Sequence, residues 1–249
     1  MKTYSSLFVA NVMALVLCLP ASADSVLVGN HSFETPDVGG FQDNNGIAAG
    51  AALPSMGDTW YYLGGFSANG SPVGVEETSG NGGQTGGDGS QSGYVNVGAA
   101  MGSANLGAIE ANKNYTLTVG VTGRFNGFNS TAGATIALAS VASGTPGDPG
   151  LADPNNWLAS QYIDFTTLST AGSVFTDYQA SFDSGALGGA IGQELVAVLV
   201  SEDNPGMNNP IGFDNVRVDV VPEPTSVFLL AIGSLVALGR PRRSVADNL

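Results

Sequence analysis

Charge of either sign is scarce in this sequence. Charged residues make up 11% of the 249 residues, less than half the share of about 25% that is usual in soluble proteins. Only 7 residues are basic against 21 acidic ones, for a formal net charge of −14. Such a chain lacks the lysine and arginine clusters that neutralise phosphates, which excludes electrostatic nucleic-acid binding. The 43% share of apolar residues argues against wholesale disorder.

Histidine and cysteine occur once each, as His31 and Cys18. This excludes zinc sites built on His and Cys clusters. A Ser-His-Asp arrangement would depend on His31, which we interpret as a structural or surface residue. Cys18 lies in the N-terminal apolar stretch, so the body of the protein is expected to contain no disulfide. The many acidic residues leave a glycosidase-type pair of carboxylates open.

The N-terminus has the pattern of a signal peptide over residues 1–23. Lys2 supplies a positive charge, residues 7–19 are apolar apart from Asn11, and Ala21-Ser22-Ala23 offers small residues for signal peptidase. We therefore expect cleavage before Asp24. The apolar stretch is too short to cross a membrane by itself.

The C-terminal residues 222–249 form a second targeting segment. Pro222-Glu223-Pro224 precedes an apolar stretch, about 225–239, which predicts a short transmembrane helix. A basic tail at 240–243 follows, with Arg240, Arg242 and Arg243. Basic residues after an apolar helix stay in the cytoplasm, so the body would lie outside. The stretch suits a transient anchor better than a permanent one.

This C-terminal segment resembles the PEP-CTERM sorting signal of Gram-negative bacteria. Pro222, Glu223 and Pro224 match its core motif, and the three arginines match its basic tail. The resemblance implies processing by an exosortase in a host that makes extracellular polysaccharide. The chain would be held in the inner membrane with its body in the periplasm, and then reach the cell surface or be secreted. A plain membrane anchor is the alternative.

Residues 24–221 read as one all-β domain. Tyr115, Leu117, Val119 and Val121 alternate with small or polar residues, which is typical of a strand with one buried face. Pro and Gly interrupt the body too often for long helices. We predict an antiparallel β-sandwich, or jelly roll. We interpret the glycine-rich segment 77–93 as a surface loop, because no helix follows it as a phosphate-binding loop requires. The other candidate strands are 25–28, 60–63, 93–97, 134–142, 158–165, 174–182, 194–201 and 212–220.

Both ends of the body resemble the galactose-binding-like jelly rolls, which include carbohydrate-binding modules. Val28-Gly29-Asn30-His31-Ser32-Phe33-Glu34 is similar to their first strand, and Gly212-Phe213-Asp214-Asn215-Val216-Arg217-Val218 to their last. The resemblance implies that the first and last strands lie side by side.

Glu34 and Asp214 are candidate calcium ligands. Strand parity puts Asp214 on the same face as Val216, Val218 and Val220, at the edge of the core, where an ionised carboxylate needs a partner. Glu34 ends the opposite motif, so the two carboxylates are expected to meet. Many members of the resembled superfamily hold a structural Ca²⁺ near this place. Carboxylates that cap loop N–H groups without a metal are an equal alternative.

Aromatic residues are the candidate ligand-binding groups. Exposed rings can stack on the apolar face of a sugar, and the residues considered lie near strand ends. They are Trp60, Tyr62, Tyr94 and Trp157, with Tyr61 and Tyr162 nearby. Packing in the core is the alternative for each ring.

The sequence therefore favours an exported, non-enzymatic surface or matrix protein, with extracellular polysaccharide as the ligand considered. Neutral glycans fit better than anionic ones, because the body is strongly acidic. The alternatives are a secreted polysaccharide-active hydrolase or lyase, and a purely structural surface protein without a ligand.

Overall fold

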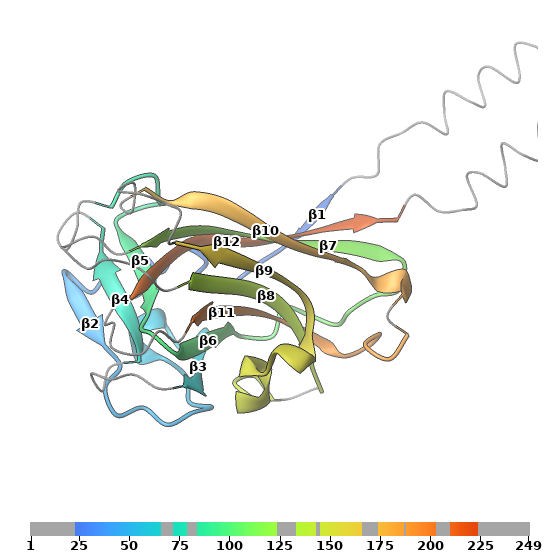
Figure 1. The fold of residues 1–249 in the computed structure, drawn as a ribbon, viewed down its shortest axis with the longest axis horizontal. Coiled ribbons are helices and arrows are strands. Elements are labelled where there is room, and N and C mark those ends of the chain that lie inside the picture. The colour runs from blue at the N-terminus through green and yellow to red at the C-terminus, as the bar shows by residue number, and fades with distance from the viewer. Residues whose placement is uncertain are drawn as a thin grey trace, which may run out of the picture.

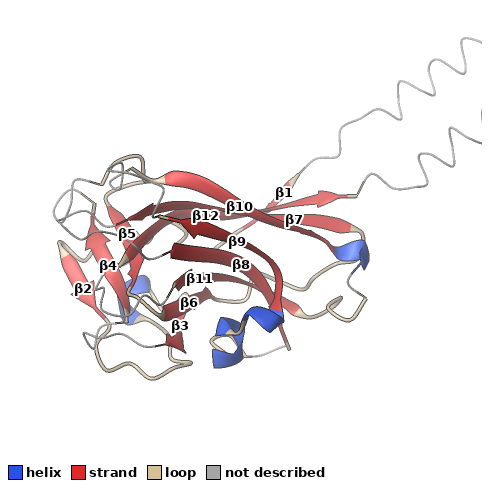
Figure 2. Cartoon of the chain, in the orientation of Figure 1, coloured by secondary structure: helices blue, strands red, loops and turns tan. Residues whose placement is uncertain are grey.

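The computed structural model describes residues 23–65, 72–78, 84–123, 133–142, 145–165, 174–186, 188–202 and 210–223. These residues form two antiparallel sheets packed face to face (Figure 1). The prediction of an all-β sandwich of the jelly-roll type is confirmed. The helices of the described residues are short 3₁₀ segments (Figure 2), namely η1 (Pro54–Met56), η2 (Pro149–Ala152), η3 (Pro154–Asn156) and η4 (Ser184–Ala186).

The first sheet is 7-stranded, in the order β10-β7-β12-β5-β4-β2, with β1 pairing with β12. Its strands are β1 (Asp24–Val26), β2 (Phe41–Asp43), β4 (Val73–Glu77), β5 (Gln91–Val95), β7 (Lys113–Gly123), β10 (Thr176–Asp183) and β12 (Ile211–Pro222). The second sheet is 5-stranded, in the order β3-β6-β11-β8-β9. Its strands are β3 (Trp60–Gly65), β6 (Ala99–Ser103), β8 (Gly133–Val141), β9 (Trp157–Asp164) and β11 (Glu194–Ser201).

The first and last strands lie side by side, as the resemblance implied. Asp24 pairs with Val220 and Val26 with Val218. The segment from Val28 to Glu34, however, is a turn rather than a strand. The Asn30 side chain closes this turn, because its Oδ1 accepts the Thr35 N–H at 3.0 Å and its amide donates to the Thr35 carbonyl at 2.6 Å.

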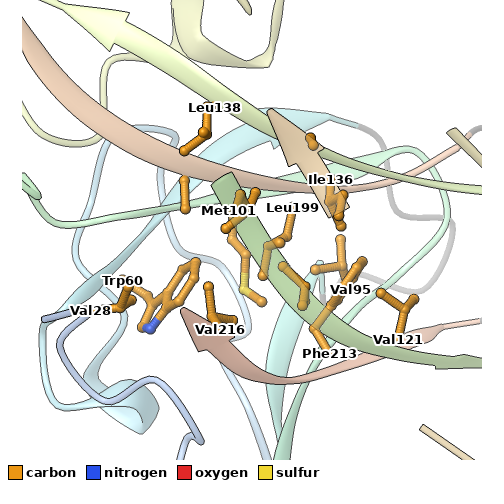
Figure 3. Close-up of a cluster of buried hydrophobic side chains, with 14 of the residues drawn as sticks. Val28, Trp60, Val95, Met101, Val121, Ile136, Leu138, Leu199, Phe213 and Val216 are labelled. Carbon is orange, nitrogen blue, oxygen red and sulfur yellow. The ribbon is translucent and has the colours of Figure 1, made fainter. Parts of the chain in front are cut away.

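The core fills the space between the two sheets. Tyr115, Leu117, Val119 and Val121 of β7 are all buried there, which confirms the predicted alternation. They meet the apolar residues of β6, β8 and β11 (Figure 3), among them Met101, Ile136, Leu138 and Leu199.

A β-bulge in β12 changes the parity of the last strand. Phe213 pairs with Val121 and Val218 with Leu117, and the register shifts between Asp214 and Arg217. Asn215, with φ 49°, provides the left-handed residue at the bulge. Phe213 and Val216 therefore both lie in the core (Figure 3). The prediction that Asp214 shares the face of Val216, Val218 and Val220 is wrong, because the extra residue turns Asp214 to the opposite face of the sheet.

The targeting segments fall almost entirely outside the described residues. This holds for the signal peptide, for Pro224, for the stretch 225–239 and for Arg240, Arg242 and Arg243. Within the described part of the chain, no helix is long and apolar enough to span a membrane. Pro222 and Glu223 are described, and Pro222 is the last residue of β12.

Candidate functional site

Asp214 lies on the outer face of the 7-stranded sheet, beneath a loop. Its side chain is 0% exposed. Its Oδ2 accepts the backbone N–H of Asp88 at 2.6 Å, and its Oδ1 accepts that of Asn215 at 2.7 Å. Asp88 belongs to residues 84–90, which precede β5 and which we call the glycine loop. The loop is thus fastened to the last strand by a buried carboxyl group.

Burial raises the pKa of Asp214 from its ordinary value of 3.8 to about 7. Loss of hydration is the largest cause, since it disfavours the charged carboxylate. The N–H donors of Asp88 and Asn215 act in the opposite direction, and the negative charges of Asp88 and Glu34 add to the rise. Asp214 therefore gains and loses its proton near neutral pH.

Glu34 fastens the other end of the same loop. Its Oε1 accepts the backbone N–H groups of Ser90 at 2.8 Å and Gln91 at 2.7 Å. Its Oε2 accepts the Ser90 hydroxyl at 3.0 Å. The two carboxyl groups thus bond to different residues of one loop, rather than to each other.

Two glycines let the loop approach these carboxyl groups. A Cβ atom on Gly87 would lie 2.4 Å from Asp214 Oδ2, and one on Gly89 would lie 2.4 Å from Glu34 Oε1. The interpretation of 77–93 as a surface loop is thus correct for residues 85–90, which are exposed. Its last residues already belong to β5.

A buried polar network continues across the outer face toward β4. Gln84 donates its amide to Glu76 Oε1 at 2.9 Å and accepts the Ser92 hydroxyl at 3.0 Å. Glu76 and Ser92 are each 0% exposed. Phe175 covers the adjoining backbone, since a Cβ atom on Gly87 would lie 3.2 Å from its ring. This part of the outer face is therefore enclosed rather than open to water.

The geometry supplies only part of a calcium site. Ca²⁺ takes six to eight oxygen ligands, whereas Glu34 and Asp214 offer four. Each of these four oxygens already accepts a hydrogen bond. The described residues contain no group of three or more His, Cys, Asp or Glu side chains that could hold a metal ion. Backbone carbonyls and water would have to complete the shell, so calcium at this place stays a prediction.

His31 is a surface residue beside the glycine loop. Its Nε2 lies 3.7 Å from Asp88 Oδ2, and its side chain is 45% exposed. Its backbone carbonyl accepts the N–H of Val216 at 2.8 Å, next to the bulge. This main-chain contact holds the turn against β12 and could be made by any residue at this position.

Three of the four candidate aromatic residues lie in the interior. Trp60 and Tyr94 are 0% exposed and Tyr62 is 8% exposed. The Trp60 ring packs on Phe33 with centroids 5.1 Å apart and lies beside Val28 and Val216 (Figure 3). The expectation that these rings offer exposed stacking faces is wrong, because Trp60 and Tyr62 lie in the core of the sandwich, whereas Tyr94, on the other face of its sheet, is covered by the stacked ring of Phe41.

Trp157 is half-buried at the start of β9, an edge strand. Its indole N–H donates to the Leu151 carbonyl at 2.8 Å, and its ring packs against Leu151 and its apolar neighbours. Tyr162, on the same strand, is 55% exposed. Trp157 pairs with Ala139 and Tyr162 with Thr135, so both side chains lie on the outer face of the second sheet.

The sorting motif begins on the body itself. Pro222 pairs with Lys113 of β7, and the Glu223 N–H donates to the Asn112 carbonyl at 3.0 Å. The Glu223 carboxylate accepts the Gly185 N–H at 3.1 Å. A hydrogen bond with the Asp183 carboxyl group raises the pKa of Glu223.

The family match covers the body from end to end. Residues 24–219 match the HpiC1-like family, described as HpiC1 cyclase. The chain belongs to the HpiC1-like family. Residues 220–243 match the PEP-CTERM protein-sorting motif, which confirms the resemblance of the C-terminus and identifies this HpiC1-like chain as an exosortase-sorted surface protein. No curated protein matches the chain.

Solved structures share the fold of this HpiC1-like body. A cyclase from Fischerella sp. TAU is similar with a TM-score of 0.56 and 19% identity, over 82% of this chain and 100% of that chain. A cyclase from the same source, in complex with 4-(1H-indol-3-yl)butan-2-one, has a TM-score of 0.55 and 17% identity, over 81% and 100% of the two chains. Identities this low show the fold alone.

Carbohydrate-binding jelly rolls are more distant structural neighbours. The CBM22-1 xylan-binding domain of Paenibacillus barcinonensis Xyn10C has a TM-score of 0.39 and 14% identity, over 83% of this chain and 100% of that chain. A likeness at this level does not bear on the ligand. A family described as a cyclase makes catalysis a second candidate function for the HpiC1-like chain.

Proposed function

We propose that this exosortase-sorted surface protein binds neutral polysaccharide through the outer face of β9 and does not act as an enzyme. The observation that carries the proposal is the position of Tyr162. The hydroxyl end of its ring lies against the backbone of Gly133 in the neighbouring strand β8, since a Cβ atom there would lie 2.3 to 2.5 Å from its hydroxyl oxygen and two ring carbons. The side chain is thus held at its tip, and the residue is 55% exposed, which leaves ring surface on which a sugar can stack.

Trp157 and polar groups extend this platform. The partners of Trp157 and Tyr162 on β8 are Ala139 and Thr135, which the rise of a strand separates by about 13 Å. The exposed Ser160 lies between the two aromatic residues. Thr135 donates its hydroxyl to Glu202. An edge strand with aromatic, polar and aromatic side chains on one face suits an extended chain of sugars.

The charge of the protein favours a neutral ligand. The formal net charge is −14, so an anionic polysaccharide would be repelled unless divalent cations bridged it.

The hydrogen bonds of the Glu34 and Asp214 carboxyl groups support a non-enzymatic role. Three of the four oxygens of Glu34 and Asp214 hold the glycine loop and the fourth accepts the Asn215 N–H, whereas a catalytic acid must reach the substrate.

Binding and release of sugar by the body, residues 24–223, would test this proposal. The solved relatives consist of such a body alone, since this chain covers 100% of theirs. We expect retention on neutral polysaccharides of the host without release of reducing sugar. Tyr162→Ala should abolish retention without unfolding the body, because the ring is exposed.

Two further variants make the test specific. Gly133→Ala should also abolish retention, because the three atoms nearest to a Cβ atom there all belong to the movable Tyr162 side chain. Phe41→Ala is the matched control, since Phe41 is 42% exposed on the edge of the other sheet. Equal retention of all variants would contradict the proposed site, and release of sugar would contradict the non-enzymatic role.

Proton transfer by Asp214 is the second candidate function. A carboxyl group with a pKa of about 7 can serve as an acid near neutral pH, and the family is described as a cyclase. The test is calorimetry with 4-(1H-indol-3-yl)butan-2-one, the compound in one Fischerella cyclase structure. Binding that Asp214→Asn abolishes would favour this candidate over polysaccharide binding, and no binding would count against it.

A further inference from the structure

The first two residues of the Pro-Glu-Pro sorting motif are part of the folded body. Pro222 is the last residue of β12 and pairs with Lys113. The next residue, Glu223, continues the ladder, because its N–H donates to the Asn112 carbonyl at 3.0 Å. The main chain of Pro222 and Glu223 is thus paired with the body at the motif on which the exosortase would act.

The Glu223 side chain has its own contacts on the body. One carboxylate oxygen accepts the Gly185 N–H at 3.1 Å, a group that also donates to Asp183 Oδ1 at 2.7 Å, and the carboxyl group lies beside that of Asp183. Gly185 follows the end of β10 and lies in η4, which is held against β7 because the Ser184 hydroxyl accepts the Lys113 N–H at 2.9 Å. These groups form a docking surface for Glu223 at one end of the sandwich.

We propose that this docking surface holds back the sorting motif, and that exosortase processes the chain only after Pro222 and Glu223 leave the body. An enzyme that reads an extended peptide needs its main-chain N–H groups and its side chains. Here the N–H and the carboxylate of Glu223 are both engaged by the body. The docked and the exosortase-bound states of Glu223 therefore exclude each other.

The docked fraction then sets the rate of processing. If the enzyme acts only on the undocked form, the rate of processing is proportional to the undocked fraction of the chains. The contacts lie at the surface and are few, so the motif would leave often enough for sorting to proceed. We expect loss of the side-chain contact to speed processing about two- to tenfold, the factor that one hydrogen bond of modest strength supplies.

Gly185→Ala crowds the Glu223 carboxylate at this contact while the motif stays intact. A Cβ atom on Gly185 would lie 2.9 Å from Glu223 Oε1 and 3.1 Å from Asp183 Oδ1. The first of these atoms ends a flexible side chain, so the carboxylate is displaced at little cost to the fold. Gly188→Ala and Gly189→Ala are matched controls, since a Cβ atom at either position meets nothing within 4 Å.

The experiment is a pulse-chase of the full-length chain in a host that contains the exosortase. The half-life of the unprocessed form is compared among the native chain, the Gly185→Ala chain and the two control chains. A fifth chain carries Gly-Ser inserted between Val221 and Pro222, which moves the motif off the strand. Shorter half-lives for Gly185→Ala and for the insertion, with unchanged controls, are the expected result.

Equal half-lives in all chains would overturn the proposal, and so would slower processing of both the Gly185→Ala chain and the insertion chain. The second outcome would mean that the docked form is the one that the exosortase recognises. Circular dichroism of each body would accompany the chase, so that a faster rate in an unfolded variant counts against the proposal. The proposal rests on the sorting motif and does not depend on polysaccharide binding.

Discussion

At the scale of single residues, Asp214 is the residue whose environment differs most from what is usual in a β-sandwich. Most carboxyl groups on the outer face of a sheet are exposed, whereas this one is fully buried beneath a loop. The sequence indicates that Asp214 needs a partner, although the strand parity behind this inference is wrong and the glycine loop, not the core, buries the carboxyl group. It does not identify the partner, since the Asp88 N–H comes from a distant loop.

The raised pKa of Asp214 predicts a pH-dependent stability. The folded protein keeps this proton between pH 3.8 and about 7, where the unfolded chain has lost it. The free energy of unfolding should therefore fall as the pH rises through this range. The contribution is at most about 4 kcal/mol, from about 1.4 kcal/mol per pKa unit. Urea unfolding of the native protein and of Asp214→Asn between pH 4 and pH 8 should show a smaller decline in the variant. Parallel pH profiles would contradict the raised pKa.

Gly87 should be sensitive to substitution, because a Cβ atom there would lie 2.4 Å from the buried Asp214 Oδ2. Gly87→Ala is expected to lower the free energy of unfolding by about 1–3 kcal/mol, which is the usual cost of overpacking. Urea unfolding measures it, with Gly189→Ala as the exposed control. A loss no larger than that of the control would mean that the loop does not press on Asp214.

At the scale of elements, the bulge in β12 decides which side chains reach the core. Strand alternation alone misplaces Asp214 and Phe213, because the sequence around Asn215 carries no glycine to signal an extra residue. The signal that was present is Asn215 itself, since asparagine tolerates the left-handed conformation better than most residues.

The bulge requires a left-handed backbone conformation at residue 215, and substitutions there can test this requirement. Asn215 has φ 49°, a conformation that costs a β-branched residue about 1–2 kcal/mol. Asn215→Val should lower the melting temperature by about 2–8 °C, whereas Asn215→Gly should leave it nearly unchanged. Thermal unfolding followed by circular dichroism distinguishes the two. Equal melting temperatures would mean that β12 forms without the bulge.

The strands themselves were predictable to different degrees. Long strands with an apolar period, such as β7 and β11, match the expected ranges closely. The sequence pattern does not indicate β2, β4 and β6, which are short and rich in polar or small residues, as in the segment Ala99–Ser103. Tertiary packing rather than local propensity forms such strands. The burial of Trp60 and Tyr94 follows from the same packing and could not be read from their position near loops.

At the scale of the whole molecule, the two carboxyl groups that hold the glycine loop predict an effect of calcium on the stability of the fold. If Glu34 and Asp214 bind Ca²⁺ together with backbone carbonyls, calcium at about a hundred times its dissociation constant adds about 2.7 kcal/mol to the free energy of unfolding. We expect a higher melting temperature in calcium than in chelator, and no difference for Glu34→Gln. Equal melting temperatures of the native protein in both buffers would leave these residues as anchors of the loop alone.

The most direct test of the proposed function uses the chain's 2 tryptophans. Trp157 borders the proposed binding face of β9, with its indole N–H bonded to Leu151, whereas Trp60 is buried in the core. In an NMR titration of the body with a neutral oligosaccharide that it retains, the indole signal of Trp157 should shift and that of Trp60 should not. Trp157→Phe assigns the two signals. If the Trp60 signal shifts alone, or if neither moves at saturation, the ligand does not bind on β9 and the proposed function is contradicted.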